Sequence, residues 1–273
     1  KLNLETFLLV LLPYILHGRY SMRGPHNILR LIRTGATFER SGAMALALNA
    51  LEAPASIRIS TRILIWPFKI FGLKGNIKYS PMLRALIALG PAYIKFGQLL
   101  STRPDVVGKE LAAELSILQD ALPPFSQKQA IKAVEGELGI KIEDVFIDFK
   151  LPIAAASLAQ VHKATVTATG QVVAVKVLRP GIEKAFLQDI DAFYFIARFI
   201  EVLSPSSRRL KPVEVIKYFE GIVREEIDLR MESAAAAEFF SNTKEDKDFK
   251  VPQVVWNLSS KRVMTTEWVD GIA

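Results

Sequence analysis

The chain has 273 residues, of which 50% are hydrophobic and 23% are charged, enough apolar sequence to form the core of one or two domains. It contains no cysteine, which excludes disulfides, cysteine nucleophiles and cysteine metal sites, and its three histidines argue against a histidine-rich metal site. The net charge of +7 fits an anionic partner such as a nucleotide or an anionic membrane, whereas no motif of basic and aromatic residues predicts nucleic-acid binding.

The first part of the chain is predicted to be helical. Apolar residues and arginines alternate over residues 28–51, which is typical of amphipathic helices. Two apolar stretches, residues 7–16 and 63–71, are shorter than the roughly 20 residues that a membrane-spanning helix needs. Contact with a membrane surface is open for both stretches, but packing in a core is the simpler interpretation.

Residues 80–142 predict a series of short helices. Ser80-Pro81 provides an N-cap and a first helical residue, and Gly90-Pro91 ends that helix and begins another. The second helix carries Lys95 and Gln98, which are three residues apart and therefore share a face. Residues 126–129 form a capping box that opens a later helix.

From residue 143 the pattern changes and predicts strands. We expect five strands, at residues 146–151, 159–167, 172–178, 251–256 and 262–269. A small-residue loop from Pro152 to Gln160 joins the first two, and a turn at Thr169-Gly170 joins the second and third. Helices at 182–202 and 213–240 lie between the third and fourth strands. The sequence therefore predicts an α+β fold with three regions: a helical region over 1–79, for which contact with a membrane surface is open, a helical extension over 80–142, and a sheet-containing unit over 143–273.

A lysine lies inside the apolar strand Val172–Leu178. An unpaired ammonium buried in such a strand is costly, so Lys176 requires either an anionic partner or a path to solvent. In a Val-Ala-Val-Lys strand the common partners are a nucleotide phosphate and a helix glutamate. The strand alone favours the path to solvent.

Acidic residues in the predicted helix 213–240 could supply that partner. At about 100° per residue, one face of this helix carries Glu225, Asp228 and Glu232. Such a face is often only a solvated charged surface, but beside a lysine-bearing strand one of these carboxylates is expected to pair with Lys176. The alanine-rich turn at 154–157 could let backbone N–H groups approach phosphates, although alanine is stiffer than glycine there.

Four motifs occur in a fixed order along the chain: Lys95-Phe96-Gly97-Gln98, Ala154-Ala155-Ala156-Ser157, Val173-Ala174-Val175-Lys176 and Glu226-Ile227-Asp228. Together they closely resemble the UbiB family of atypical kinase-like ATPases, also called ABC1, ADCK or AarF, and the chain looks most like a bacterial member. The resemblance covers about residues 80–273. It implies a protein kinase-like small lobe, a five-stranded antiparallel sheet with helices, preceded by an all-helical extension.

The resemblance also implies roles for particular residues. Lys95 and Gln98 would belong to an extension lying over the site where a peptide substrate docks, and Lys95 would pair with Glu226, with Asp228 alongside. Lys176 would hold the phosphates of ATP and pair with Glu232. The remaining nucleotide contacts would come from the phosphate loop Ala154, Ala155, Ala156 and Ser157, and from the hinge residues Glu267 to Val269, whose backbone would meet adenine.

Family members support ubiquinone biosynthesis at membranes. For this protein the resemblance implies binding of ATP or ADP with Mg²⁺, ubiquinone precursor lipids and biosynthesis proteins as partners, and a place at the cytoplasmic face of the bacterial inner membrane, either peripheral or anchored C-terminally. An ATPase that acts on lipid precursors or regulates ring hydroxylation is favoured over protein phosphorylation, because Lys95 and Gln98 obstruct the site. The alternatives are a nucleotide-binding scaffold without catalysis and, as older family naming suggests, a direct 2-polyprenylphenol 6-hydroxylase.

The sequence starts at Lys1 and stops shortly after the predicted hinge, so we expect a fragment of a longer protein. No Asp-x-Gly or His-x-Asp…Asn set follows the hinge, and Asp270-Gly271 comes too early to supply the metal aspartate. The Mg²⁺ ligands are therefore expected in a second lobe, and this chain alone is expected to bind nucleotide weakly and to turn over nothing.

Overall fold

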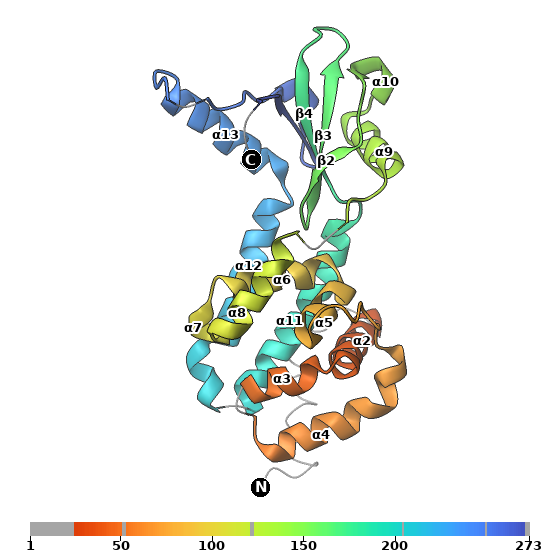
Figure 1. Ribbon diagram of the computed structural model, residues 1–273, viewed down its shortest axis with the longest axis vertical. Helices are drawn as coiled ribbons and strands as arrows, with labels where there is room; N and C mark the ends of the chain where they lie inside the picture. The colour runs from red at the N-terminus through yellow and green to blue at the C-terminus, as the bar shows by residue number, and fades with distance from the viewer. Residues whose placement is uncertain (1–24, 51–52, 121–122, 204, 249, 271–273) are drawn as a thin grey trace. The chain divides into compact units, whose positions relative to one another are not determined.

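The computed structural model describes residues 25–50, 53–120, 123–203, 205–248 and 250–270 (Figure 1). The apolar stretch 7–16 lies outside the described residues. The chain forms two compact units, one containing the residues up to 92 with 185–217 and the other containing residues 93–184 with 218–273. The helical segments that follow the third predicted strand are thus divided between the two units.

The first unit is helical. Its elements are α2 (Pro25–Ser41), α3 (Ala43–Ala50), α4 (Ala55–Ile65), the 3-10 helix η1 (Trp66–Phe71), α5 (Pro81–Leu89), most of α11 (Ile182–Leu203), η3 (Pro205–Leu210) and the first turns of α12 (Pro212–Glu226). The amphipathic helices expected over 28–51 are present as α2 and α3. Asp189 of α11 is largely buried against Arg30 of α2, and burial raises the pKa of Asp189 although the guanidinium opposes that shift.

The stretch 63–71 does not pack in a core, contrary to expectation. It covers the end of α4 and the whole of η1, and neither of these described elements contains a fully buried side chain. Apart from Ile65, its apolar side chains remain exposed, which the sequence pattern could not reveal because a hydrophobic run indicates burial whether or not a partner surface is present.

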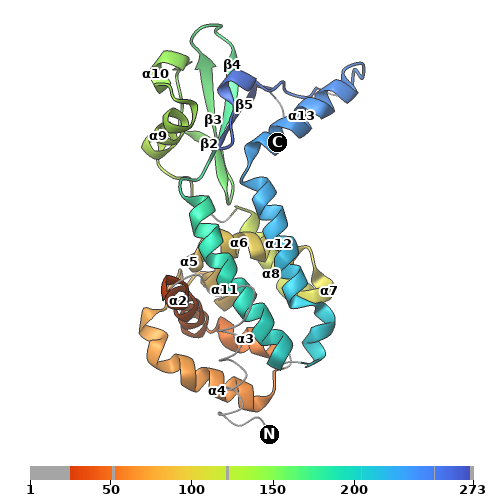
Figure 2. The same cartoon turned by 180° about the vertical axis from the view of Figure 1, so that it is seen from behind.

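The second unit contains the sheet (Figure 2). Five antiparallel strands are arranged in the order β1-β3-β4-β5, with β2 also pairing with β3; their bounds are β1 (Phe146–Ile147), β2 (Pro152–Ala155), β3 (Ala159–Val166), β4 (Val172–Leu178) and β5 (Val263–Glu267). The β3–β4 hairpin turns at Gly170, which has the left-handed φ of 69° that glycine adopts without strain. The turn predicted at Thr169-Gly170 is therefore confirmed.

Helices before and after these strands complete the second unit. They are α6 (Pro91–Ser101), which begins at the unit boundary, then α7 (Pro104–Val107), α8 (Lys109–Leu115), η2 (Ser116–Asp120), α9 (Gln127–Leu138), α10 (Ile142–Val145), the end of α12, α13 (Leu229–Thr243) and η4 (Trp256–Leu258). The capping box at Ser126 opens α9, as predicted. Ala130 and Val134 of α9 pack against the buried side chains of β4, namely Val173, Val175 and Val177.

Four predicted elements are wrong in detail. The strand predicted over 146–151 is only the two-residue β1. The segment 251–256 is not a strand, because only Val254 bridges to β5. The alanine-rich loop is partly a strand, because Ala154 and Ala155 pair with β3. The single helix predicted over 213–240 is two helices, α12 and α13, separated at Ile227-Asp228.

Candidate nucleotide-binding site

Lys176 lies on the half-exposed face of β4. Successive side chains of a strand point to opposite faces, so Val175 and Val177 are buried in the core while Lys176 projects from the other side of the sheet. Its ammonium lies 2.6 and 2.7 Å from the two carboxylate oxygens of Glu232. The lysine thus has both of the features weighed from the sequence, an anionic partner and access to solvent.

Glu232 reaches Lys176 because α13 begins only after a break in the chain. Asp228 is the N-cap of α13, and its carboxylate accepts a hydrogen bond from the backbone N–H of Arg230 at 3.2 Å. Glu232 then lies in the first turn of α13, where the helix dipole favours a negative charge. The prediction that Glu225, Asp228 and Glu232 share one helix face is wrong, because these residues belong to two helices and a cap.

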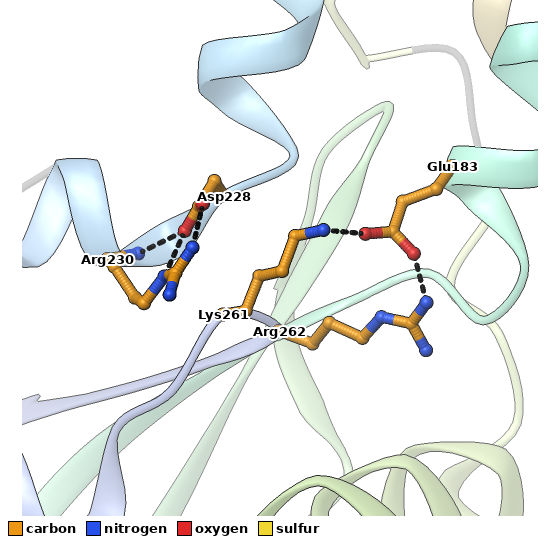
Figure 3. Close-up of polar contacts among 5 residues, drawn as sticks. All are labelled: Glu183, Asp228, Arg230, Lys261 and Arg262. Carbon is orange, nitrogen blue, oxygen red and sulfur yellow. Dashed lines mark hydrogen bonds and ion pairs between the residues drawn. The ribbon is translucent and has the colours of Figure 1, made fainter.

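Asp228 contacts an arginine. The Arg230 side chain donates to both carboxylate oxygens, with nitrogen–oxygen distances of 2.9 and 2.6 Å. This side-chain hydrogen bond lowers the pKa of Asp228, and the nearby Lys261 contributes in the same direction. Asp228 is therefore an anionic cap held by a neighbouring guanidinium (Figure 3).

The Lys-x-Gly-Gln helix, α6, carries a second ion pair. Lys95 Nζ lies 2.6 Å from a carboxylate oxygen of Glu226, the last residue of α12. The same two helices meet through an edge-to-face contact of Phe96 with Phe219, whose ring centroids are 5.2 Å apart. Gln98 contacts a different element, donating from Nε2 to the carbonyl oxygen of the buried Leu118 at 2.8 Å. Both polar side chains of the motif are held within the second unit.

The alanine-rich motif forms the end of β2 and the connection to β3. The connection is tight, because the backbone N–H of Ala156 donates to the carbonyl of Ala159 at 2.8 Å. Ser157 is buried, whereas Ala154 and Ala156 are exposed. Non-glycine residues with positive φ in the described chain are Asp148 and Lys211, so the motif turns without the left-handed conformations that glycine would offer.

A cluster that the sequence did not predict holds the lysine strand and the carboxylate helix together. The Glu183 carboxylate, in the first turn of α11, pairs with Lys261 at 2.8 Å and also with Arg262 (Figure 3). The same two basic residues use their backbone: the carbonyl of Arg262 accepts from Leu178 N–H at the end of β4, and that of Lys261 accepts from Leu229 N–H at the start of α13. The only sequence signal was a pair of adjacent basic residues before β5.

Opposing effects set the ionisation of Glu183. Partial burial alone would raise its pKa, but the hydrogen bonds from Lys261 and Arg262, together with their charges, outweigh that effect and lower the pKa. Glu183 is therefore anionic at neutral pH and bridges two cations of the same loop.

The predicted hinge begins at Glu267, the last residue of β5, and continues beyond the strand. The backbone N–H of Glu267 donates to the carbonyl of Gln253 at 2.8 Å, and that of Trp268 donates to the carbonyl of Val172 in β4 at 3.1 Å, so Trp268 is tied to the sheet. The Trp268 ring also lies under the ammonium of Lys163, at 4.1 Å from the ring centroid. Val269 is half-buried beside them. Whether this segment meets adenine stays a prediction.

No group of three or more acidic or histidine side chains within the described residues could hold a metal ion. The residues predicted to act on nucleotide come instead as two lysine–glutamate pairs, Lys176–Glu232 and Lys95–Glu226. An ammonium of this kind binds phosphate oxygens, and a nucleotide would bring Mg²⁺ to neutralise its own phosphates.

Residues 117–273 match the ABC1 atypical kinase-like domain. The chain belongs to this family. It is 43% identical over 189 residues, 69% of this chain, to a "Probable protein kinase UbiB" of Pseudomonas putida, and 38% identical over 220 residues, 80% of this chain, to that of Cellvibrio japonicus. These matches confirm the predicted resemblance, and with the antiparallel sheet they confirm the predicted fold class.

The chain spans 35% and 40% of the lengths of these two relatives. Among solved structures, it is similar to a chain from the complex of Rv3197 with erythromycin from Mycobacterium tuberculosis, with 29% identity and a TM-score of 0.46. That match covers 67% of this chain and 46% of the other.

Proposed function

We propose that the second unit is the nucleotide-binding small lobe of an atypical kinase-like ATPase, in which Lys176 holds the phosphates of ATP. The observation that carries this proposal is the ion pair from β4 to α13, because active protein kinases require a strand lysine paired with a helix glutamate. The pair lies within the residues that match the kinase-like family.

The energetics of the pair also favour a functional role. The side chains of Lys176 and Glu232 are 32% and 48% exposed, and an ion pair so open to water contributes only about 0–1 kcal/mol to folding. The fold therefore has little need of this lysine. Presenting an oriented ammonium to an anionic ligand is the better explanation for its place in the sheet.

For the whole protein we propose a part in ubiquinone biosynthesis that uses Mg-ATP and acts on precursor lipids or on the biosynthesis proteins. Its place would be the cytoplasmic face of the bacterial inner membrane. Protein phosphorylation is the less favoured activity. Lys95 and Gln98 lie on α6, the helix expected to obstruct a peptide site, where Lys95 is held by Glu226 and Gln98 by the carbonyl of Leu118. Family membership supports this proposal.

The nucleotide proposal is tested by thermal melting of the full-length protein with and without Mg-ADP, because this chain alone is expected to bind nucleotide weakly. A ligand that binds only the folded state stabilises it by about 2.7 kcal/mol at a hundredfold excess over the dissociation constant. We expect the wild type to shift, and Lys176→Ala and Glu232→Gln to lose the shift while melting near the wild-type temperature without ligand. Lys128→Ala, which changes an exposed lysine of α9 in the same unit, is the matched control and should keep the shift.

Two results would refute this assignment. Absence of a shift in the wild type at roughly millimolar nucleotide would reject the nucleotide site, since binding that weak could not hold ATP in a cell. An undiminished shift in Lys176→Ala would reject the role of this lysine. ATP hydrolysis by the full-length protein, lost in Lys176→Ala, would then separate an ATPase from a nucleotide-binding scaffold.

A further inference from the structure

The first unit exposes an apolar surface that the proposed nucleotide site does not use. Seven large apolar side chains along α4 and η1 are exposed. Four of them define the α4–η1 surface, namely Ile59 (59%), Ile63 (69%), Trp66 (70%) and Ile70 (76%), and the other three are Leu64, Phe68 and Phe71. The helix that carries it is labelled at the edge of the helical unit in both ribbon views (Figures 1 and 2). Contiguous apolar surface of this kind usually marks a site of interaction.

The spacing of these side chains produces one continuous stripe. They follow one another at intervals of four, three and four residues. Ile59 and Ile63 share one side of α4, which advances about 100° per residue, and Trp66 and Ile70 continue the exposed apolar surface in the 3-10 helix η1. The opposite side of α4 faces its own unit, where Ile65 lies over Gly35 of α2 and a Cβ on that glycine would be 3.2 Å from the isoleucine. The exposed stripe is thus the outward side of a packed helix.

The end of the stripe is fixed to α2. Gly72 follows η1 so close to α2 that an added Cβ would lie 2.4 Å from the carbonyl oxygen of Ala36. Arg40 donates to the Gly72 carbonyl at 2.7 Å, and Thr37 accepts from the Leu73 N–H at 3.0 Å. These contacts hold η1 in place, so the surface presents an ordered set of apolar side chains.

The segment that contains the stripe carries charge of one sign in its own sequence. From residue 53 to residue 104 the sequence contains no aspartate or glutamate, and the part near the stripe contains the exposed cations Arg58, Arg62, Lys69, Lys74 and Lys78. Arg58 contacts the side-chain oxygen of Asn49, and Arg62 lies 3.7 Å from Glu39 of α2. Arg58 and Arg62, four residues apart in α4, fall on one flank of the apolar stripe, and Lys69 follows in η1.

We propose that the α4–η1 surface docks on an anionic lipid bilayer, with the helices lying in the plane of the membrane interface. Apolar residues on one face and cations beside them are what such binding requires, because the first enter the acyl boundary and the second meet anionic headgroups. Trp66, between Ile63 and Ile70, suits the headgroup level that tryptophan prefers. Among the described residues no helix is long and apolar enough to cross a membrane.

This inference rests on the membrane location proposed above and deepens it by naming the surface that makes the contact. It does not depend on the nucleotide site, because no residue of the surface belongs to that site. Its test is co-sedimentation of the purified chain with vesicles of phosphatidylglycerol and phosphatidylcholine, compared with vesicles of phosphatidylcholine alone. We expect binding to the anionic vesicles that weakens in high salt, since exposed charges are screened.

The decisive variant is Ile63→Glu with Ile70→Glu, which places two carboxylates in the middle of the stripe. Binding to anionic vesicles should fall at least about tenfold, because the variant loses apolar insertion and adds charge repulsion. The matched control is Ile147→Glu with Leu151→Glu, two exposed apolar residues of the second unit, and it should bind as the wild type does. Both variants change exposed positions, and circular dichroism confirms that each is folded.

Three results would overturn the proposal. Equal binding of the wild type and the Ile63/Ile70 variant would exclude this surface, and equal binding to neutral and anionic vesicles would exclude the charge complementarity. A wild-type chain that ignores vesicles but self-associates, and becomes monomeric in the Ile63/Ile70 variant, would identify the surface as an interface between two copies. Melting with Mg-ADP is measured without lipid, so its outcome and that of the vesicle experiment are independent.

Discussion

Acid should destabilise the second unit through His162, which lies fully buried in β3. Its Nδ1 is 2.7 Å from the carbonyl oxygen of Lys150, so Nδ1 carries the proton and donates. Its Nε2 is 2.8 Å from Nε2 of Gln160 and must therefore accept. The Gln160 amide is held by the backbone of Phe125: its oxygen accepts from the N–H at 2.9 Å, and its nitrogen donates to the carbonyl oxygen at 3.2 Å. Rotating the amide by about 180° so that its oxygen could accept from a protonated imidazole would break both of these hydrogen bonds.

The sign of the effect follows from this neutral state. Burial lowers the pKa of His162 below its ordinary value of 6.5, although the bond to the Lys150 carbonyl acts in the opposite direction. Below pH 6.5 the imidazole of His162 binds a proton in the unfolded chain but stays neutral in the folded chain. The stabilisation present above pH 6.5 is therefore lost as the pH falls. One such group changes the free energy of unfolding by about 1 kcal/mol between about pH 7 and pH 5.5.

Urea unfolding at these two pH values measures the effect, with His162→Gln as the variant. The glutamine does not titrate, so the variant should lose about 1 kcal/mol less on acidification than the wild type, whatever its stability at neutral pH. Replacing the other two histidines together, His17→Gln with His26→Gln, is the matched control. If the wild type and His162→Gln lose the same free energy on acidification, the neutral assignment of His162 is wrong.

Three further predictions concern the fold. Gly72→Ala should destabilise the first unit by about 1–3 kcal/mol in thermal melting, because the new Cβ meets the Ala36 carbonyl; an unchanged melt would mean that η1 can move aside. Ser126→Ala should lower the free energy of unfolding in urea by about 1 kcal/mol through loss of the capping box, whereas Ser126→Asp should keep most of that stabilisation because aspartate also caps helices. Glu183→Gln should cost about 1 kcal/mol at neutral pH, and since the pKa of Glu183 is lowered, its difference from wild type should shrink in acid below about pH 4.5. A difference independent of pH would contradict the charge pairing.

Local signals in the sequence predicted the parts of the fold that depend on few residues. A capping box, a proline at the first position of a helix and a glycine in a hairpin each depend only on a few neighbouring residues, so Ser126, Pro81 and Gly170 could be assigned without knowing the rest of the chain. The pairs Lys176–Glu232 and Lys95–Glu226 needed the family motifs, because nothing in the spacing of these residues indicates which carboxylate meets which lysine.

The features that the sequence did not predict depend on distant contacts. Alanines have a low preference for strands, yet Ala154 and Ala155 pair with β3 because that strand offers them backbone partners. The Glu183 cluster joins the start of α11 to the loop before β5. The end of α12 has neither glycine nor proline to mark it, and the next helix starts where Leu229 N–H finds the Lys261 carbonyl.

That break explains how one short segment serves two lysines. In a continuous helix Glu226 and Glu232 would be separated by about 600° of rotation, and so would point about 120° apart on a single rigid rod. Ending α12 at Glu226 directs that carboxylate to Lys95 on α6, and starting α13 at Leu229 directs Glu232 to Lys176 on β4. Asp228 makes the division possible by capping α13, with a carboxylate kept anionic by Arg230. In this structure Glu226 of the Glu-x-Asp motif therefore pairs with a lysine, and Asp228 caps the helix that carries Glu232.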